Sequence, residues 1–312
     1  MTLVQLEYII AVDTYKSFVA AAEKCFITQP TLSMQIQKLE DTLGVKIFDR
    51  SRQPVVATEI GQQIIAQART ILNESKQLKE IIKVFNNELS GELKVGVIPT
   101  VAPYLLPQVI PGFTESFPKV QLKIWEYTTE QIIQNLKLGL LDCGVLATPL
   151  EESSLHEIPL FYEGFVVYLS SSSSLVPKKV ITYKDLNFDE LWLLNEGHCM
   201  RNQVLNICQK TKTGQSLKQF EYNTGSVETL KRMVDLNSGI TILPELSLKD
   251  LSDEQMSRVR NFAAPVPVRE ISIVTHRNFL KRGVIKAFEG AILNVIPSNM
   301  LQKEEKDLLE TF

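Results

Sequence analysis

Residues 28–44 read Thr-Gln-Pro-Thr-Leu-Ser-Met-Gln-Ile-Gln-Lys-Leu-Glu-Asp-Thr-Leu-Gly, and this stretch carries the clearest structural signal in the chain. Thr28 predicts a helix N-cap, Pro30 falls in the first turn where its missing N–H costs nothing, and Gly44 predicts the helix end. Apolar residues recur between these ends at spacings of four, three and four: Leu32, Ile36, Leu39 and Leu43. The other face carries polar side chains: Gln29, Thr31, Ser33, Gln35, Gln37 and Lys38.

The sequence on either side of this helix predicts a small DNA-reading module. Two shorter amphipathic helices precede it, the second after Ser17 as N-cap. Two short apolar runs follow it, 45–48 and 55–57, around a polar turn, which predicts a wing. Short polar side chains on a helix reach base edges, and cations on a wing reach phosphates. The candidate DNA-binding residues are therefore the polar and basic residues Thr28, Gln29, Thr31, Ser33, Gln35, Arg50 and Arg52, and we include Pro30 from the same first helical turn.

The run from Phe26 to Arg50, continued through Thr58 and Gly61, resembles the winged helix-turn-helix of LysR-type transcriptional regulators. A polar-faced helix alone is more often a solvated surface, but here the turn, the cap and the wing are all in register. The resemblance implies promoter DNA as a partner, self-assembly from dimer to tetramer, and contact with RNA polymerase. We place this DNA-binding domain at residues 1–58.

Residues 59–89 predict one long helix, because no Gly or Pro follows Gly61 and the apolar stripe is too continuous for a solvated spacer. A partner helix is expected to cover that stripe. The family resemblance implies the linker helix through which such regulators dimerise, so that two reading heads face two half-sites on the DNA.

From Ser90-Gly91 onward the pattern changes to alternating strands and helices, which indicates an α/β fold with parallel sheets. Ligands of such sheets bind at the carboxyl ends of the strands, where Thr100, Thr129 and the segment before Cys199 fall. The resemblance implies a periplasmic-binding-protein-like regulatory domain of two α/β subdomains, subdomain I at about 90–161 and 269–297 and subdomain II at about 162–268. The charged tail, 298–312, is expected to be helical or frayed, and we assign it no function.

Two thiols, Cys199 and Cys208, lie nine residues apart in a segment with helical spacing. Cys199 is expected at a helix N-terminus, where the macrodipole and the nearby Arg201 favour the thiolate that peroxides attack. In a helix the two thiols would be roughly 13 Å apart along the axis. Since a disulfide needs Cα atoms within about 7 Å, forming it would require the helix to unwind. Two half-buried structural cysteines remain the alternative interpretation.

Four segments, 97–107, 141–143, 197–201 with Cys208, and 226–244, resemble the peroxide-sensing members of the LysR family. This resemblance implies that Cys199 is oxidised by hydrogen peroxide and Cys208 then forms the disulfide, with reversal by a glutaredoxin- or thioredoxin-type reductant and activation of antioxidant genes. It also implies a peroxide pocket shaped by Thr100, Thr129, His198 and Arg201. One departure is Asn202, which stands where we expect an acidic residue and puts the stability of the thiolate in doubt.

Composition sets outer limits on these interpretations. At 312 residues, with 44% hydrophobic and 22% charged residues, the chain predicts two or three globular domains. No signal peptide or membrane span is apparent, so we expect a cytoplasmic protein with resting thiols reduced. Scattered histidines and the lack of a CxxC spacing argue against a metal site, and we expect no cofactor. We expect Cys25 and Cys143 to be core residues.

Two other functions fit parts of the sequence. The first is a metabolite-sensing LysR-type regulator whose cleft binds a small anion and whose cysteines are not sensors. The second is an enzyme, a thiol peroxidase with Cys199 as the nucleophile, and the DNA-reading helix argues against it. The net charge of −3 disfavours a purely electrostatic nucleic-acid binder, although that objection is weak when only one small domain contacts DNA.

Overall fold

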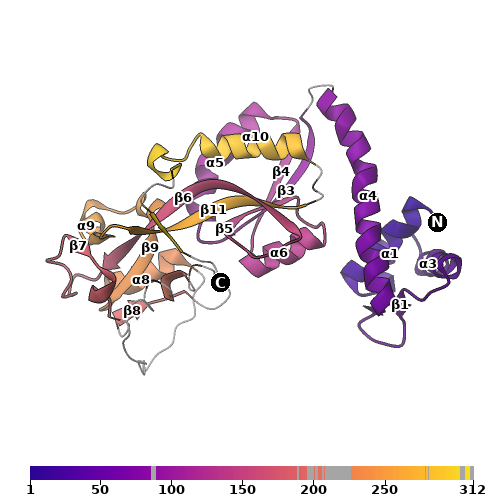
Figure 1. Cartoon of the computed structure of the whole chain (residues 1–312), viewed down its shortest axis with the longest axis horizontal. Helices are drawn as coiled ribbons and strands as arrows, with labels where there is room; N and C mark the ends of the chain where they lie inside the picture. The colour runs from indigo at the N-terminus through magenta and orange to yellow at the C-terminus, as the bar shows by residue number, and fades with distance from the viewer. Residues whose placement is uncertain are drawn as a thin grey trace. The chain divides into compact units, whose positions relative to one another are not determined.

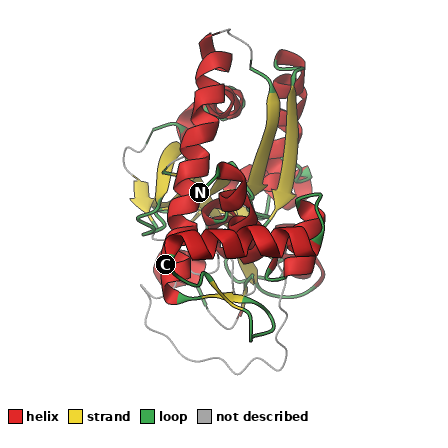
Figure 2. Ribbon diagram, turned by 90° about the vertical axis from the view of Figure 1, so that its right-hand side faces the viewer, coloured by secondary structure: helices red, strands yellow, loops and turns green. Residues whose placement is uncertain are grey.

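The computed structural model describes the whole chain except residues 86–88, 188–189, 195–199, 201–202, 206, 208–225, 278, 280, 303–305 and 310–312. Two compact units form, unit 1 over residues 1–88 with 278–280 and unit 2 over residues 89–277 and 281–312. Nearly all strands belong to unit 2, where they pack with helices, while unit 1 is mainly helical (Figures 1 and 2).

Unit 1 is a bundle of helices with a two-stranded wing. Its elements are α1 (Leu3–Tyr15), α2 (Phe18–Lys24), α3 (Gln29–Leu43), β1 (Phe48–Asp49), β2 (Val56–Ala57) and α4 (Glu59–Phe85). The apolar stripes of the first three helices and the start of α4 meet in one core around Ile9, Leu32 and Ile36, all fully buried. In the wing, Phe48 pairs with Ala57 in antiparallel register.

Local signals account for the ends of these helices. The Thr28 hydroxyl accepts a hydrogen bond from the N–H of Thr31 at 3.4 Å, and Gly44 ends α3 with φ +71°, so both predicted helix boundaries are confirmed. Gly61 serves a different purpose, because a Cβ there would collide with the carbonyl of Ile47. Glycine therefore lets α4 begin directly against the wing.

In unit 2, a mixed sheet runs in the order β4-β3-β5-β11-β6, with helices on both faces. Its strands are β3 (Gly91–Val97), β4 (Val120–Glu126), β5 (Cys143–Thr148), β6 (Leu155–Leu169) and β11 (Val266–His276). On one face, α5 (Ala102–Ser116) packs against α10 (Arg282–Leu293) through Phe113 and Phe288, whose ring centroids are 5.4 Å apart. On the other face lies α6 (Thr129–Lys137) (Figure 1).

The long strands β6 and β11 continue from this part of unit 2 into a second, smaller one (Figure 1). There β6 pairs with β9 (Ile240–Pro244) and β10 (Val259–Phe262), β8 (Leu191–Trp192) pairs with β9, and β7 (Val180–Ile181) pairs with β10. Its helical elements are α8 (Val227–Leu236), α9 (Asp253–Met256) and the 3-10 turns η1 (Tyr183–Asp185) and η3 (Glu245–Leu248).

The expectation of parallel sheets is wrong for the central strands. β3 is parallel to β4 and β5, as βα units require, but β11 runs antiparallel to β5 and β6, and β6 runs antiparallel to β9. The run of apolar residues that marks a strand in the sequence covers only the last third of β6, from Phe165. Its first two thirds alternate less regularly, and they form a strand because they pair with β11.

The tail also departs from the expected helix or frayed end. After the 3-10 turn η4 (Ser298–Met300), β12 (Lys306–Leu308) adds to the sheet in parallel with β11. The N–H of Leu309 donates to the carbonyl of Val268 at 2.9 Å, and the Leu309 side chain is buried. Tyr183 donates to Asp307 at 2.9 Å. An open strand edge supplies backbone partners to a segment whose own propensity for a strand is weak.

Candidate DNA-reading surface and regulatory pocket

The solvent-facing side of α3 begins at its N-terminal turn. Gln29, Pro30 and Thr31 are exposed there, as the sequence predicted. The same face carries Met34, which is 60% exposed and was not among the predicted DNA-binding residues. Its position four residues after Pro30 would have placed it on the polar face, but an apolar side chain is usually assigned to the core. An exposed methionine offers apolar contact to a thymine methyl group.

Several predicted DNA-binding side chains have partners within the protein. Gln35 is half-buried and accepts a hydrogen bond from Gln5 of α1 at 3.3 Å, so it faces the bundle. Ser33 accepts from the guanidinium of Arg50 at 2.9 Å, which joins the helix to the wing. The Thr28 hydroxyl lies 2.8 Å from that of Thr31. These contacts orient the reading surface.

The wing is held by one buried acid, Glu40 of α3. Its carboxylate accepts from the N–H groups of Ile47 at 2.8 Å and Phe48 at 3.3 Å, which are the residues that enter the wing. Arg50 lies 3.5 Å from the same carboxylate and 4.9 Å above the ring of Phe18. Arg52 is exposed and pairs with Asp49 at 3.2 Å. The Arg50 side chain is thus held by Glu40 and Phe18, while most of the Arg52 side chain is exposed to solvent.

In unit 2, Thr100 and Thr129 follow the carboxyl ends of adjacent parallel strands. Val97 of β3 is paired with Glu126 of β4, and each threonine lies three residues beyond its strand's paired residue. Both side chains are buried. Thr128 caps α6 through the N–H of Gln131, so Thr129 is the first residue of the helix, as predicted. This edge is where parallel strands present ligand-binding groups.

Arg269 of β11 is a site residue that the sequence analysis missed. It is completely buried and donates to the hydroxyl of Thr100 at 2.9 Å and to its carbonyl at 3.2 Å. Its other partner is Glu163 of β6, which is also fully buried. The Nε atom of Arg269 donates to a carboxylate oxygen of Glu163 at 2.8 Å. Burial raises the pKa of Glu163, opposed by Arg269 and by the N–H of Leu246, which donates to it at 2.9 Å. No local motif marks this pair, because its members belong to distant strands.

A second polar contact joins α5 to the first turn of α8. Tyr104 donates to Glu228 at 2.6 Å, and the buried ammonium of Lys231 donates to the same carboxylate oxygen at 2.7 Å. Lys231 also donates to the carbonyl of Ser247 at 2.5 Å. Burial and the Glu228 carboxylate raise the pKa of Tyr104, which keeps its hydroxyl a donor. The start of α8 is therefore fastened to the element that follows Thr100.

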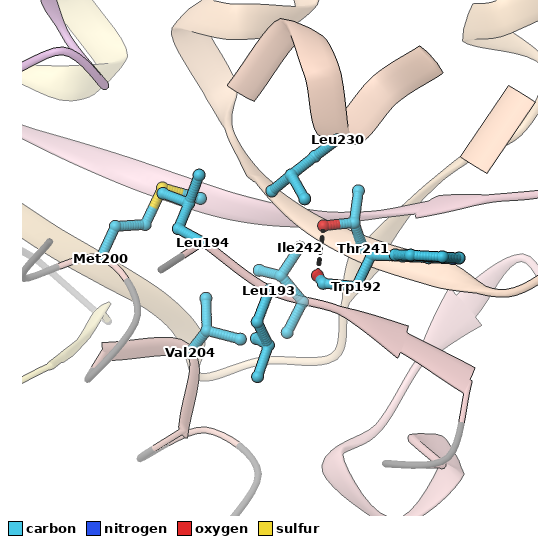
Figure 3. Close-up of a pocket in the computed structure, with 8 residues that line it drawn as sticks. All are labelled: Trp192, Leu193, Leu194, Met200, Val204, Leu230, Thr241 and Ile242. Atoms are coloured by element: carbon cyan, nitrogen blue, oxygen red, sulfur yellow. Dashed lines mark hydrogen bonds between the residues drawn. The ribbon is translucent and has the colours of Figure 1, made fainter. Parts of the chain in front are cut away.

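The described residues between 200 and 207 are helical, as the spacing predicted, and they are anchored by apolar side chains. Met200, Val204 and Ile207 are each at most 3% exposed. Met200 and Val204 line a narrow apolar pocket with Trp192, Leu193, Leu194, Leu230, Thr241 and Ile242 (Figure 3). The Thr241 hydroxyl donates to the carbonyl of Trp192 at 2.9 Å beside it. The amide of Gln203 is also buried, and it has no hydrogen-bond partner among the described residues.

The predicted residues His198, Cys199, Arg201 and Cys208 lie outside the described residues. Of the other two cysteines, Cys143 is fully buried on β5, and burial strongly raises its pKa. Cys25 is half-buried at the end of α2, and its pKa is raised by burial and by Glu7. Neither thiol has the exposed, cation-rich surroundings of a reactive one.

In the part of the chain that the structure describes, no helix has the length and apolar character needed to cross a membrane. The same described residues contain no cluster of His, Cys, Asp and Glu suited to a metal ion.

Comparison with known proteins assigns both units. The model of the bacterial regulatory helix-turn-helix protein, lysR family, matches residues 3–62, and that of the LysR substrate binding domain matches residues 86–296. The chain is 37% identical over 274 residues to a hydrogen peroxide-inducible genes activator of Haemophilus influenzae, covering 88% of this chain and 90% of that one. It is 38% identical over 248 residues to the DNA-binding transcriptional dual regulator OxyR of Escherichia coli K12, covering 80% of each chain.

Among solved structures, a full-length OxyR variant from Pseudomonas aeruginosa superposes with a TM-score of 0.76 at 36% identity, covering 94% of this chain and 98% of that one. The fold expected from the sequence, a winged helix-turn-helix followed by a periplasmic-binding-protein-like domain, is confirmed. The chain belongs to the LysR family of DNA-binding transcriptional regulators and is not an enzyme.

Proposed function

We propose that this regulator senses hydrogen peroxide through Cys199 and Cys208 and activates antioxidant genes when oxidised. The observation that carries the proposal is the similarity over 88% of the chain to a hydrogen peroxide-inducible genes activator, combined with two thiols that lie nine residues apart in the sequence. A sensor of this kind works in a compartment such as the cytoplasm, where thiols rest reduced. Promoter DNA, a second copy of the chain and RNA polymerase are its proposed partners.

The chemistry uses two thiols and one peroxide. The Cys199 thiolate attacks one peroxide oxygen and breaks the O–O bond, which leaves a sulfenic acid and releases hydroxide that takes up a proton to become water. The Cys208 sulfur then attacks the sulfenic sulfur, forms the disulfide and displaces a second water. Two thiols have been oxidised and one hydrogen peroxide reduced to two waters. A dithiol reductant of the glutaredoxin or thioredoxin type reverses the reaction by exchange.

Geometry supports a pocket in which this reaction runs. Thr100 is buried and hydrogen-bonded to the guanidinium of Arg269, which also pairs with Glu163, at the edge where Thr129 also lies. We propose that the donors of Arg269 favour the thiolate and the developing negative charge on the leaving oxygen. We include Arg269 with Thr100, Thr129, His198 and Arg201 among the residues that shape the peroxide pocket.

The switch would work by removing the apolar side chains of the segment between residues 200 and 207 from the core. A disulfide between residues 199 and 208 is incompatible with a continuous helix across them, so Met200, Val204 and Ile207 would leave their buried positions. Glu228 and Lys231, held at the start of α8, would carry the change to α5 through Tyr104. A rearrangement between subunits would then re-space the two reading heads.

The test is peptide mass mapping under non-reducing conditions after one equivalent of hydrogen peroxide, with DNA footprinting on the same samples. We expect a linked Cys199–Cys208 peptide, reversed by a dithiol, together with a changed footprint. Cys199→Ser and Cys208→Ser should abolish both changes, while the matched control Cys143→Ser should keep them. If both thiols stay alkylatable in excess peroxide, the chain is instead a metabolite-sensing regulator. The serine variants should then still respond to a small anion, and they should be screened for a changed footprint in the presence of such anions.

Two substitutions in the helical segment should shift the disulfide midpoint potential in opposite directions. Val204→Ala removes packing from the reduced form, at a cost of about 2 kcal/mol, and should make the potential about 40 mV more negative. Gln203→Leu removes a buried amide without partners among the described residues, stabilises the reduced form by about 1.5 kcal/mol, and should make the potential about 30 mV less negative.

These potentials are measured by equilibration in glutathione buffers and thiol trapping. Val12→Ala is the matched control, since Val12 is equally buried but lies in α1 of unit 1 and should lose the same contacts in both redox states. Its midpoint should stay within about 5 mV of the wild-type value. Shifts of the same sign for Val204→Ala and Gln203→Leu would contradict the release of the segment on oxidation.

A further inference from the structure

Phe26, in the turn between α2 and α3, combines two features that rarely occur together. Its side chain is 95% exposed, the highest exposure among the large hydrophobic residues that the structure describes. Its backbone has φ +56°, in the left-handed region that bulky residues seldom adopt. Neither burial nor backbone preference explains a phenylalanine at this position.

Hydrogen bonds define the turn around it. The N–H of Phe26 donates to the carbonyl of Glu23 at 3.2 Å, and the N–H of Ile27 donates to that of Ala22 at 3.1 Å. This pair of bonds is the Schellman motif, in which the left-handed position is usually glycine. The same chain places Gly44 at the left-handed end of α3. Phe26 therefore combines a strained backbone conformation with a ring exposed to solvent, and strain of this kind concentrates at functional sites.

The neighbours of Phe26 indicate what the ring contacts. Thr28, the N-cap of the reading helix, follows it by two residues, and Gln29 is exposed just beyond. Lys24, exposed at the end of α2, precedes it by two residues and supplies a cation. The N-terminal part of the reading helix is the part that contacts base edges in helix-turn-helix proteins. In sequence, the exposed ring therefore lies between a cation and this helix end, which favours a contact with double-stranded DNA over a contact with another protein.

We propose that Phe26 is a DNA-contacting residue whose ring packs against a thymine methyl group or a sugar at the edge of the reading helix. The contact is apolar, so it contributes to affinity without neutralising a phosphate. This role is independent of peroxide sensing, because it concerns the contact of unit 1 with DNA in either redox state.

The test uses three full-length variants and a duplex selected from a random library by the wild-type protein. Phe26→Ala and Phe26→Gly should each weaken binding about tenfold, while Phe26→Tyr keeps the ring and should bind within threefold. The slope of log affinity against log salt should be unchanged in all three. As the matched comparison, Arg52→Ala at the exposed wing cation should reduce that slope by about one.

Hydrogen exchange on the same full-length variants tests the strain. Phe26→Gly should slow exchange of the buried amides of α2 and α3 about fivefold, because glycine accepts the left-handed backbone without penalty. Phe26→Ala should not slow it. The proposal fails if Phe26→Ala binds DNA within twofold of wild type, or if the slope of its log affinity against log salt falls. It also fails if the weaker binding of Phe26→Ala follows a loss of self-association measured by light scattering. A rate of hydrogen exchange that is unchanged in Phe26→Gly would contradict it as well.

Discussion

Replacing Glu163 alone by Gln should lower the free energy of unfolding of unit 2 by about 3–5 kcal/mol, because the fully buried Arg269 would be left without its counter-charge. Arg269→Met should have an effect of similar size, since it leaves the buried Glu163 carboxylate without its counter-charge and removes the donors to Thr100. Both losses are measured by urea unfolding combined with hydrogen exchange of the β6 and β11 amides in the full-length protein.

The double variant Glu163→Gln/Arg269→Met provides the decisive comparison. It leaves no unpaired charge, and the amide oxygen of the introduced glutamine can still accept from Leu246, so it should recover to within about 2 kcal/mol of wild type. The exposed pair of Lys137 and Glu152, at 2.7 Å, is the control for ion-pair chemistry, and Glu152→Gln should cost less than about 1 kcal/mol. Additive losses in the double variant would show that the two charges do not compensate each other.

Recovery of stability should not restore sensing. If Arg269 contributes positive charge to the peroxide pocket, the stable double variant will fold and bind DNA but form the disulfide more slowly with peroxide. A normal oxidation rate in this variant would limit Arg269 to a structural role and leave the rest of the sensing proposal intact.

Glu40→Ala should produce the largest effect in unit 1, lowering its free energy of unfolding by about 3 kcal/mol. The substitution leaves the N–H groups of Ile47 and Phe48 buried without an acceptor, and each such group costs about 1–3 kcal/mol. It also removes the partner of Arg50, so the wing should lose its position against α3 and DNA binding should fall with stability.

Glu40→Gln separates these contributions. The amide oxygen of Gln can still accept the two backbone bonds, so only the ion pairs with Lys46 and Arg50 are lost, and the cost should fall to about 1 kcal/mol. Asp41→Ala, at the exposed neighbouring position, should change stability by less than about 0.5 kcal/mol. The changes in stability are to be measured by hydrogen exchange of the α3 amides in the full chain. Equal losses for Glu40→Ala and Glu40→Gln would contradict the role of the hydrogen bonds from the backbone N–H groups.

Much of the local structure could be predicted because its causes are local. The ends of α3 at Thr28 and Gly44 follow from capping and from backbone freedom, and the alternation in β3 follows from a strand with buried side chains. The family resemblance added the order of the domains, which the comparisons confirmed. The pairing and reaction of Cys199 and Cys208 stay predictions.

Other features depend on partners far away in the chain, which no pattern in a short window reports. Gln35 looks like a DNA-reading residue on a helical wheel, yet its amide oxygen accepts from Gln5 in α1. Part of the tail forms β12 because β11 offers an open edge there.

The sequence by itself determined the helices of unit 1, where the reading helix begins and ends, and which two thiols lie nine residues apart along the chain. Only the tertiary structure decided that Glu163 and Arg269, 106 residues apart, form the buried ion pair beside Thr100, and that Glu40 holds the wing. The physical reason is range: caps and periodicity act over a few residues, whereas a buried charge finds its partner only when distant strands are brought together.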